Sequence, residues 1–435
     1  MPTDFLQDFQ ARELLAQVTA ERELGEHLAT GPRTLYSGFD PTAESLHIGS
    51  LVPLLALRRA QLAGHRPIVL IGGATGLIGD PSFKAQERSL NSPDTVASWV
   101  DRLRAQTGRF VDFEAGDNAA LVVNNLDWTA GVPVLDFLRD IGKHFSVNAM
   151  IGKESVRQRL DREGEGISFT EFSYMILQSY DFAQLYKDYG CTIQIGGSDQ
   201  WGNITGGIDL TRRLHQAQVY GATLPLVTKA DGSKFGKTES GTVWLDAAKT
   251  SPYSFYQFWL NTADDDVYRF LRYFTFLAPA EIDALQAEDA ERSGRKAAQQ
   301  LLAAEVTELV HGSPGLQAAQ RISEALFAGE PGGLAQADLE QLQLDGLPSL
   351  ALADEYLGGQ TPLTSLFVDA GLAKAGKQVK DALSRGAVTV NGRSIGWEQN
   401  MQAGSVFCTE NALFGRYFVV RLGKKSHALL VLPGN

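Results

Sequence analysis

The sequence predicts an α/β protein with a parallel sheet, followed by a helical domain and a small α+β domain. Three observations support this prediction. Short apolar runs alternate with helical stretches up to about residue 245, alanine-rich helical sequence follows to residue 328, and a strand-and-turn pattern appears near the C-terminus. Strands that alternate with helices form parallel sheets covered by helices, because parallel strands need a long crossover connection.

In the first domain, residues 1–245, predicted strands alternate with helical sequence. Residues 34–40 read as a short strand that ends at a glycine, and residues 46–63 read as a helix closed by Gly64. Three more apolar runs have the length and composition of buried strands: residues 67–71, 120–123 and 191–195.

The remaining sequence divides at a stretch rich in glycine and proline. Ser251-Pro252 is typical of a helix start, and we expect a helical domain over residues 246–328. Residues 329–362 contain Gly-Glu-Pro-Gly-Gly and Gly-Gly-Gln-Thr-Pro, which favour a linker. The last domain, residues 363–435, begins with two short helical segments, and residues 387–392 then predict a strand and an Asn-Gly turn.

Composition restricts the classes of function. A chain of 435 residues is too long for one compact core, and no apolar run approaches the length of a membrane span. Residues 1–24 are polar and carry both signs of charge, unlike a secretion signal. Two distant cysteines, Cys191 and Cys408, favour a reducing cytoplasm over a disulfide framework. The lack of Cys-x-x-Cys and His-Glu-x-x-His spacings predicts no protein-bound metal.

The net charge of −12 is unevenly distributed along the chain. Residues 361–435 carry 9 Lys or Arg against 4 Asp or Glu, whereas the rest carries 30 against 47. A small basic domain on an acidic body is what a local RNA contact requires, and chance scatter of charge is the alternative.

The glycine-rich run at residues 72–79 allows two interpretations. It follows a predicted strand and has glycines at 73, 76 and 79, which is also the spacing of the cofactor loop of short-chain dehydrogenases. That class of enzyme needs a downstream Tyr-x-x-x-Lys pair, and the sequence contains none. Tight turning and close backbone approach explain the glycines without a cofactor.

Residues 170–189 predict a well-buried helix, since their apolar side chains point in several directions. Tyr174, Gln178 and Asp181 stand at positions i, i+4 and i+7 and therefore share one face. A buried carboxylate needs a partner. The spacing alone is compatible with a solvated stripe, a core salt bridge or the polar wall of a pocket.

Two further segments carry candidate chemistry. His47-Ile48-Gly49-Ser50 is a small-residue turn with a histidine, and it can open a helix. Lys234-Phe235-Gly236-Lys237-Thr238 sets two lysines three residues apart among glycines, which predicts a mobile cationic loop. Taken alone, the histidine fits an ordinary core or surface position, and the lysines fit a solvated loop.

Together, these segments resemble the two nucleotide signatures of class I aminoacyl-tRNA synthetases. The surrounding motifs narrow the resemblance to the bacterial tyrosyl-tRNA synthetases, and they occur in that family's order over nearly the whole chain: Tyr36-Ser37-Gly38-Phe39-Asp40-Pro41-Thr42-Ala43, His47-Ile48-Gly49, Gly79-Asp80-Pro81-Ser82, Phe169-Thr170-Glu171-Phe172-Ser173-Tyr174, Gly196-Gly197-Ser198-Asp199-Gln200-Trp201-Gly202-Asn203 and the lysine segment. The resemblance implies a Rossmann-like catalytic domain, a helical anticodon-side domain and an S4-like RNA-binding domain in residues 363–435.

The resemblance also implies the residues of the site. Tyrosine would be bound by Tyr36, Asp80, Tyr174, Gln178, Asp181 and Gln200, with Tyr36 and Asp181 on its phenol. ATP would be bound by Gly38, Asp40, His47, Gly49, Ser50, Asp199, Lys234 and Lys237. The catalytic residues near the leaving pyrophosphate would be Thr42, His47, Lys84, Arg88, Lys234 and Lys237. The family's first signature usually ends in histidine rather than Ser50, whose hydroxyl we expect to satisfy a backbone group at the helix start.

The implied activity is that of a cytoplasmic enzyme that activates L-tyrosine with ATP and transfers it to tRNA(Tyr). ATP would act as a substrate with Mg²⁺. The implied partners are L-tyrosine, ATP, tRNA(Tyr) and a second copy of the chain, which would be contacted through residues 128–160, with no membrane. The implied RNA contacts are Lys377, Lys380, Arg385 and Arg393.

Two related alternatives remain at this point. A tryptophanyl enzyme of the same fold is disfavoured because the pair Tyr36 and Asp181 suits a phenol. A catalytically inactive RNA-binding relative is disfavoured by the retained lysines and His47.

Overall fold

The computed structural model of the chain consists of two compact units. One comprises Met1–Thr238 with Ala263–Ala298, and the other comprises Glu239–Thr262 with Gln299–Asn435. The helical segment expected at 246–328 is thus divided between the two units. The residues that the structure describes are 5–80, 91–153, 156–157, 160–161, 166–232, 235–238, 241–291, 297–357, 361–396 and 403–433.

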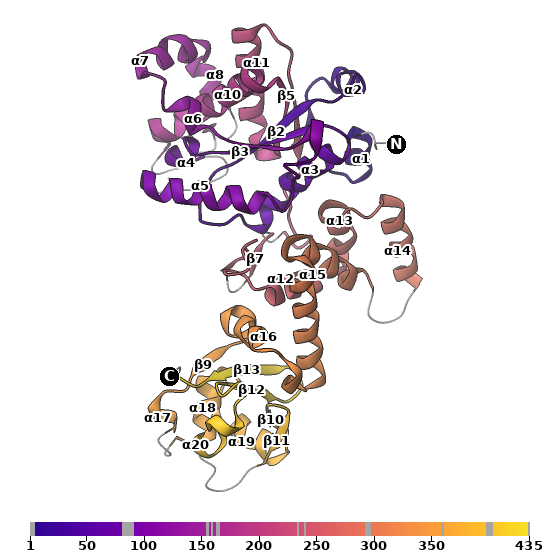
Figure 1. Ribbon diagram of the computed structural model, residues 1–435, viewed down its shortest axis with the longest axis vertical. Coiled ribbons are helices and arrows are strands. Elements are labelled where there is room, and N and C mark those ends of the chain that lie inside the picture. The colour runs from indigo at the N-terminus through magenta and orange to yellow at the C-terminus, as the bar shows by residue number, and fades with distance from the viewer. Residues whose placement is uncertain are drawn as a thin grey trace. The chain divides into compact units, whose positions relative to one another are not determined.

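A six-stranded, mostly parallel sheet forms the centre of the first unit (Figure 1). Its order is β1-β6-β5-β2-β3-β4, in which β2 pairs in parallel with β3 and β5, and the edge strand β1 runs antiparallel to β6. The strands predicted from the sequence are confirmed. The structure also contains β6, a strand that was not predicted. The bounds are β1 (Gln17–Val18), β2 (Thr34–Phe39), β3 (Arg66–Ile71), β4 (Leu121–Asn124), β5 (Cys191–Gly197) and β6 (Tyr220–Leu224).

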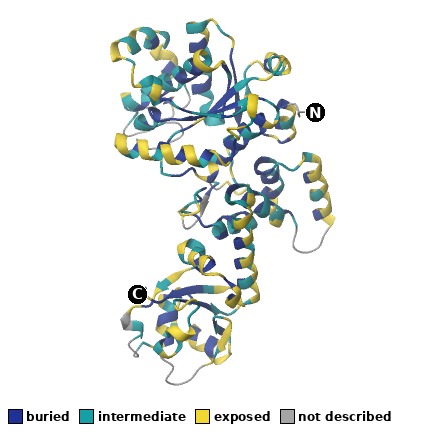
Figure 2. Ribbon diagram, viewed as in Figure 1, coloured by how far each residue is buried: buried dark blue, intermediate teal, exposed yellow. Residues whose placement is uncertain are grey.

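Helices surround this sheet, and its central strands are buried (Figure 2). The helix predicted over residues 170–189 is confirmed as α10, which begins where the Ser168 side chain accepts a hydrogen bond from the Glu171 N–H and ends at Gly190 with φ of 61°. The helices are α1 (Phe5–Ala11), α2 (Glu21–Ala29), α3 (Leu51–Leu62), α4 (Thr75–Ile78), α5 (Pro93–Thr107), α6 (Leu126–Thr129), α7 (Val134–Asp136), α8 (Val147–Ile151), α10 (Phe169–Tyr189), α11 (Trp201–His215), α13 (Asp264–Phe274) and α14 (Pro279–Glu291).

The carboxyl ends of the parallel strands place the polar motifs at one edge of the sheet. Asp40 follows β2, Gly72 follows β3, Asn125 follows β4, and Asp199 comes soon after β5. Because ligands of open parallel sheets bind outside the carboxyl ends of the strands, this edge is where a site is expected.

The second unit contains a five-stranded sheet with order β11-β10-β12-β13-β9. The predicted strand and turn near residue 390 are confirmed: β10 and β11 pair antiparallel around Asn391 and Gly392, whose φ values are 49° and 82°. Positive φ at both positions is what a two-residue type I′ turn requires. The strands are β8 (Gly241–Thr242), β9 (Ser349–Ala351), β10 (Val388–Val390), β11 (Arg393–Ile395), β12 (Tyr417–Leu422) and β13 (Ser426–Val431).

Two helices of the second unit have an end close to the one predicted from the sequence. Ser251 caps α12 by accepting a hydrogen bond from the Ser254 N–H, and α15 ends at Ala328, where the helical sequence was expected to end. The helices are α12 (Pro252–Leu260), α15 (Ala298–Ala328), α16 (Gln336–Gln341), α17 (Asp354–Leu357), α18 (Leu363–Asp369), α19 (Gly376–Ser384) and α20 (Ala403–Val406). Within the described ranges, no helix is long and apolar enough to cross a membrane.

Residues 329–357 are folded, in contrast to the linker expected at 329–362. They contain α16 and β9, which pairs in parallel with β13. Leu339 and Leu342 are fully buried in a core that also contains Val419. The glycines and prolines that suggested a linker terminate and start short elements, since Gly329 has φ of 79° directly after α15.

Candidate functional site

A cavity of about 420 Å³ lies in the first unit at the carboxyl edge of the sheet. Most of the residues predicted for the tyrosine and nucleotide sites line it: Tyr36, Gly38, Asp40, Thr42, His47, Gly49, Ser50, Asp80, Tyr174, Gln178, Asp181, Asp199 and Gln200. Lys84, Arg88 and Lys234 lie outside the described residues. Lys237 belongs to the short strand β7 (Lys237–Thr238), for which only the backbone is described.

Asp181 lies on α10 at the buried end of the cavity. One carboxylate oxygen accepts a hydrogen bond from Asn125 Nδ2 at 3.0 Å, and the other accepts one from Trp128 Nε1 at 2.9 Å. Burial raises the pKa of Asp181 to about 7, although these two hydrogen bonds favour the ionised form. The two hydrogen bonds fix the direction of the carboxylate. Because each oxygen accepts only one of them, both keep free lone pairs for a ligand.

Tyr36 lies on β2 and lines the same cavity. Its side chain is fully buried and its ring meets that of Phe182 edge-on at 5.3 Å. Its hydroxyl has no hydrogen-bond partner among the described residues. Burial, with a smaller contribution from the charge of Asp181, raises the pKa of Tyr36 well above its usual value, so the hydroxyl is a neutral donor and acceptor. A buried hydroxyl without a partner is costly, which indicates a polar ligand group at this position.

Asp40 holds a second polar cluster at the end of β2. Its two oxygens accept hydrogen bonds from the Tyr174 hydroxyl at 2.7 Å and the Thr75 hydroxyl at 2.6 Å. Burial, followed by the charges of Asp40 and Asp80, raises the pKa of Tyr174 well above its usual value. Gly72 makes room for this cluster, because a Cβ there would lie 2.0 Å from Asp40 Oδ1.

A chain of amides beside the cavity links α10 to the start of α11. Asn203 Nδ2 donates to Gln178 Oε1 at 2.9 Å and to Gln200 Oε1 at 3.0 Å. Gln200 Nε2 in turn donates to Asp80 at 2.9 Å and to Asp199 at 3.2 Å. Burial, and to a lesser degree the charge of Asp80, raises the pKa of Asp199. Neighbouring carboxylates of this kind suit a ligand that carries a cationic group.

His47 starts the helical turn of the first signature. Its Nδ1 accepts a hydrogen bond from the Gly49 N–H at 3.0 Å, which leaves Nε2 as the protonated nitrogen of the neutral ring. Ser50 makes no capping hydrogen bond with its side chain. The expectation that the Ser50 hydroxyl satisfies a backbone group at the helix start is therefore wrong, and only the preceding turn has a side-chain cap, the ring of His47.

The side chains that hold the predicted residues in place were not among those predicted from the sequence. Asn125, Trp128, Thr75 and Asn203 each donate to a residue that was predicted. The pair of asparagines at the end of the 120–123 strand was a usable signal, since polar side chains after a buried parallel strand lie at the ligand-binding edge. The position of Trp128 opposite Asp181 had no sequence signal.

The fold and this pocket define a class I tRNA synthetase. Residues 28–328 match the family described as "tRNA synthetases class I (W and Y)", and residues 338–430 match the "Tyrosine--tRNA ligase SYY-like C-terminal domain". The chain is 59% identical to a tyrosine–tRNA ligase of Aliivibrio fischeri (strain MJ11) over 428 residues, 98% of each chain. It is 56% identical to one of Escherichia coli O139:H28, over 98% of this chain and 99% of the other.

The comparison with a solved structure supports the same family. A C-terminally truncated mitochondrial tyrosyl-tRNA synthetase of Aspergillus nidulans superimposes with a TM-score of 0.67 at 29% identity, covering 75% of this chain and 94% of the other. The chain belongs to the tyrosine–tRNA ligase family.

Proposed function

We propose a residue-level account of the tyrosine–tRNA ligase reaction in this chain. The reaction joins L-tyrosine to ATP as tyrosyl-adenylate with release of pyrophosphate, and then transfers tyrosine to tRNA(Tyr). We assign adenylate formation to residues 1–245 and contacts with tRNA to residues 363–435 and to residues 246–262 and 299–328, which lie outside the first unit. The observation that carries it is the unpartnered Tyr36 hydroxyl in the same buried cavity as Asp181.

The buried end of the cavity receives the phenol of tyrosine. The phenol donates its proton to the Asp181 carboxylate and accepts from the Tyr36 hydroxyl, which satisfies both groups. A site built to hydrogen-bond a hydroxyl rejects an analogue that lacks it, a rule for which this class of enzyme is itself the usual example. The ammonium group of tyrosine binds at Tyr174, Gln178 and Asp80, where anionic and amide oxygens gather.

The other end of the cavity receives ATP. Gly38, Asp40 and Asp199 lie near the ribose and the aminoacyl carbonyl, with Gln200 beside them, while Gly49 and Ser50 border the nucleotide. Thr42 and His47 face the leaving pyrophosphate, and Lys84, Arg88, Lys234 and Lys237 complete its binding. Mg²⁺ arrives with ATP and neutralises phosphate charge. The carboxylates of Asp80 and Asp199, whose charges disfavour one another, fit a pocket that takes cationic groups.

The chemistry needs positioning and cations more than proton transfer. The carboxylate of tyrosine is already a nucleophile: its oxygen forms the bond to the α-phosphorus as the bond to the β-phosphate oxygen breaks. The obstacles are the approach of two anions and the charge that builds on pyrophosphate. Oriented substrates, lysines and an imidazole N–H at the leaving group lower this barrier.

Tyrosine-dependent exchange of pyrophosphate into ATP tests this account. The chain should catalyse exchange with L-tyrosine and far more slowly with L-phenylalanine or L-tryptophan. Equal exchange with L-tryptophan would contradict the assignment of the Tyr36 and Asp181 pair to a phenol.

We further propose that the chain acts as a homodimer through the segment 128–160. Val134, Leu135, Leu138 and Val147 are all more than half exposed, and Leu135 reaches 74%. Apolar side chains gathered in one segment at this exposure are typical of a protein interface. In sedimentation equilibrium we expect the mass of two chains, and Leu135→Glu should yield the mass of one. A wild-type chain that sediments as a monomer at micromolar concentration would contradict the proposal.

The C-terminal domain is the proposed RNA contact, and its charge can be tested without truncation. Lys377, Lys380, Arg385 and Arg393 are all exposed, on α19, just after it, and on β11. Replacing the four by glutamine should weaken tRNA charging and reduce the steepness of its salt dependence by about one for each lost phosphate contact. Tyrosyl-adenylate formation should not change.

The matched control for that experiment replaces Lys424 and Lys425, two exposed lysines in the turn between β12 and β13. An equal loss in this control would mean that net charge, rather than the face of α19, binds tRNA. Unchanged charging by the fourfold variant would contradict the RNA role.

The free cysteines Cys191 and Cys408 support our placement of the reaction in the cytoplasm.

A further inference from the structure

One face of α13 contacts the second nucleotide signature. We propose that Asp266, Phe270 and Phe274 of α13 are positioning residues, which hold residues 228–232 and 235–238 so that Lys234 and Lys237 can act on ATP. The inference rests on the proposed function, because it assumes that Lys234 and Lys237 take part in adenylate formation.

The three residues form a single stripe along the helix. They stand at i, i+4 and i+8, and this spacing places them on one face of an α-helix. All three are buried. A buried carboxylate needs a polar partner and buried phenylalanines pack against apolar or aromatic side chains, and the signature segment provides both.

The polar end of the stripe fixes the backbone that leads into the signature. Both oxygens of Asp266 accept from the Ala230 N–H at 3.1 Å, and Asp266 also pairs with Arg269. Arg269 Nη2 donates to the Thr228 carbonyl at 2.6 Å. Two backbone positions before the signature are therefore held by side chains of α13.

The aromatic end of the stripe holds the signature itself. The ring of Phe235 stacks on Phe274 with centroids 5.3 Å apart and planes 19° apart, and it meets Phe270 edge-on at 5.2 Å. Phe235 also lines the cavity of the candidate site. The signature is thus attached to α13 by a side chain that lies between its two lysines.

The next residue brings the two nucleotide signatures together. Gly236 is buried, has φ of 78°, and lies so close to the first signature that a Cβ there would be 2.5 Å from Ile48 Cγ2. Ile48 directly follows His47, the capping residue of that signature. Holding Phe235 on α13 therefore also holds Gly236 against the element that carries His47.

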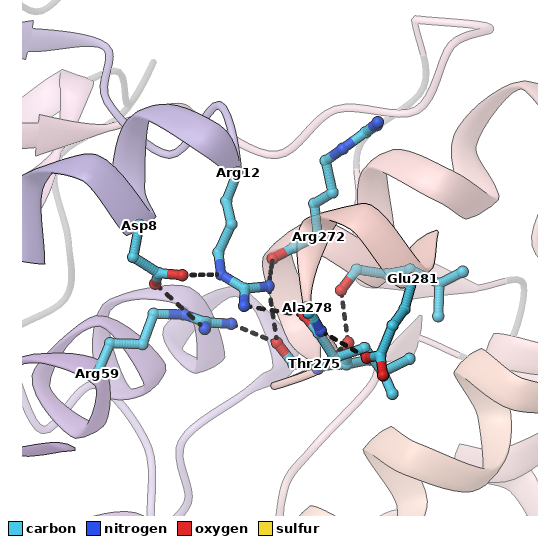
Figure 3. A network of polar contacts seen from close by, with 9 residues as sticks. Asp8, Arg12, Arg59, Arg272, Thr275, Ala278 and Glu281 are labelled. Atoms are coloured by element: carbon cyan, nitrogen blue, oxygen red, sulfur yellow. Dashed lines mark hydrogen bonds and ion pairs between the residues drawn. The ribbon is translucent and has the colours of Figure 1, made fainter. Parts of the chain in front are cut away.

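The far end of α13 is fixed by two arginines, Arg12 in the turn after α1 and Arg59 on α3 (Figure 3). Arg12 donates to the Arg272 carbonyl at 3.4 Å and to the Leu277 carbonyl at 2.9 Å, and Arg59 donates to the Thr275 carbonyl. Asp8 pairs with both guanidinium groups, at 2.7 Å and 3.6 Å. Cations at the carboxyl end of a helix satisfy its last carbonyls and complement its dipole.

Rigid placement matters in this reaction because catalysis is mainly positioning, and a displacement of about 1 Å can slow a reaction about a hundredfold. Phe274→Ala should therefore slow adenylate formation about ten- to a hundredfold and leave tyrosine affinity unchanged, with Phe274→Leu showing a smaller effect. Phe110→Ala is the matched control, since Phe110 is a fully buried phenylalanine of the same unit that does not line the cavity.

The experiment combines single-turnover rates, tyrosine affinity and backbone hydrogen exchange in the full-length chain. In Phe274→Ala, the amides of residues 228–232 and 235–238 should exchange faster while those of β2 and β3 keep their protection. The double variant Phe235→Ala/Phe274→Ala should be no slower than the slower single variant, because either substitution already removes the contact between Phe235 and Phe274.

Unchanged exchange at residues 228–238 in Phe274→Ala overturns the proposal, as does an equal slowing in Phe110→Ala or faster exchange with a normal rate. Failure of the proposed function looks different. In that case Lys237→Ala would form adenylate at the wild-type rate, whatever Phe274→Ala does to the exchange of the segment.

Discussion

Replacing Asp181 by alanine should nearly abolish tyrosine binding. The substitution removes a charge-assisted hydrogen bond to the phenol, while Asn125 Nδ2 keeps its hydrogen bond to Thr75 and Trp128 Nε1 loses its acceptor. The lost hydrogen bond and the buried phenol left without its acceptor together amount to about 2–5 kcal/mol, or a factor of roughly thirty to several thousand in affinity. Equilibrium dialysis with L-tyrosine measures the effect directly.

Two other variants make this result specific. Asp188→Ala changes an exposed carboxylate on the same helix and should leave tyrosine affinity as it is. Tyr36→Phe retains the ring and should weaken the preference for tyrosine over phenylalanine. Normal activation of tyrosine by Asp181→Ala would refute the assignment of the phenol to this end of the cavity.

The pKa of about 7 at Asp181 gives tyrosine binding a pH dependence of definite sign. The phenol donates to the ionised carboxylate, so below about pH 7 the free protein must lose a proton on binding. Affinity should therefore fall as pH decreases, by up to about tenfold per pH unit. Asp181→Asn should abolish this dependence.

The stability of the free protein should change with pH in the opposite direction, because protonated Asp181 stabilises the fold. The folded pKa lies above the ordinary value of 3.8, so the folded state binds this proton more tightly than the unfolded state. The contribution is fully present below about pH 4 and is lost as pH rises through about 7. Unfolding of Asp181→Asn by denaturant at pH 5 and pH 8 isolates this contribution.

Replacing Lys237 by alanine should slow adenylate formation with little change in tyrosine affinity. A cation that acts on the leaving pyrophosphate stabilises the transition state more than the bound substrates. Its loss should cost roughly 2–4 kcal/mol, the scale for removal of one preorganised charge-stabilising group. Lys234→Ala should behave in the same way, and single-turnover kinetics separate the rate from binding.

Lys229 provides the control for the two lysines. It lies in the same part of the chain but before the signature, and Lys229→Ala should retain the wild-type rate. A large loss of tyrosine affinity at an unchanged rate, in either signature variant, would place that lysine at the amino acid rather than at the phosphates.

Local sequence patterns predicted most of the catalytic sheet because buried parallel strands are apolar and end in glycine or polar residues. Helical spacing placed Tyr174, Gln178 and Asp181 on one helix face, and all three line the cavity. β6 was missed because Tyr220-Gly221-Ala222-Thr223-Leu224 contains few branched side chains, although the fold buries every one of these residues. Its identity as a strand depends on pairing with β5 rather than on its own composition.

The supporting residues of the site depend on contacts between distant segments, which one sequence does not reveal. Trp128 meets Asp181 across 53 positions, and Tyr174 meets Asp40 across 134. The fold of the segment 329–357 was missed for a related reason. Its glycines and prolines are real breaks in helices, but whether the residues between the breaks pack in a core is decided by elements that come later in the chain.

The division of the chain into its two units has a consequence for synthesis. The first unit is interrupted by Glu239–Thr262, which belongs to the second, and resumes with Ala263–Ala298. A nascent chain that has emerged as far as Thr238 therefore carries every strand of the central sheet but lacks α13. Since domains fold as units while the ribosome still adds residues, the catalytic unit can finish folding only after α13 has left the exit tunnel. The short segment 239–262 must wait longer still, until its own partners near the C-terminus have been made.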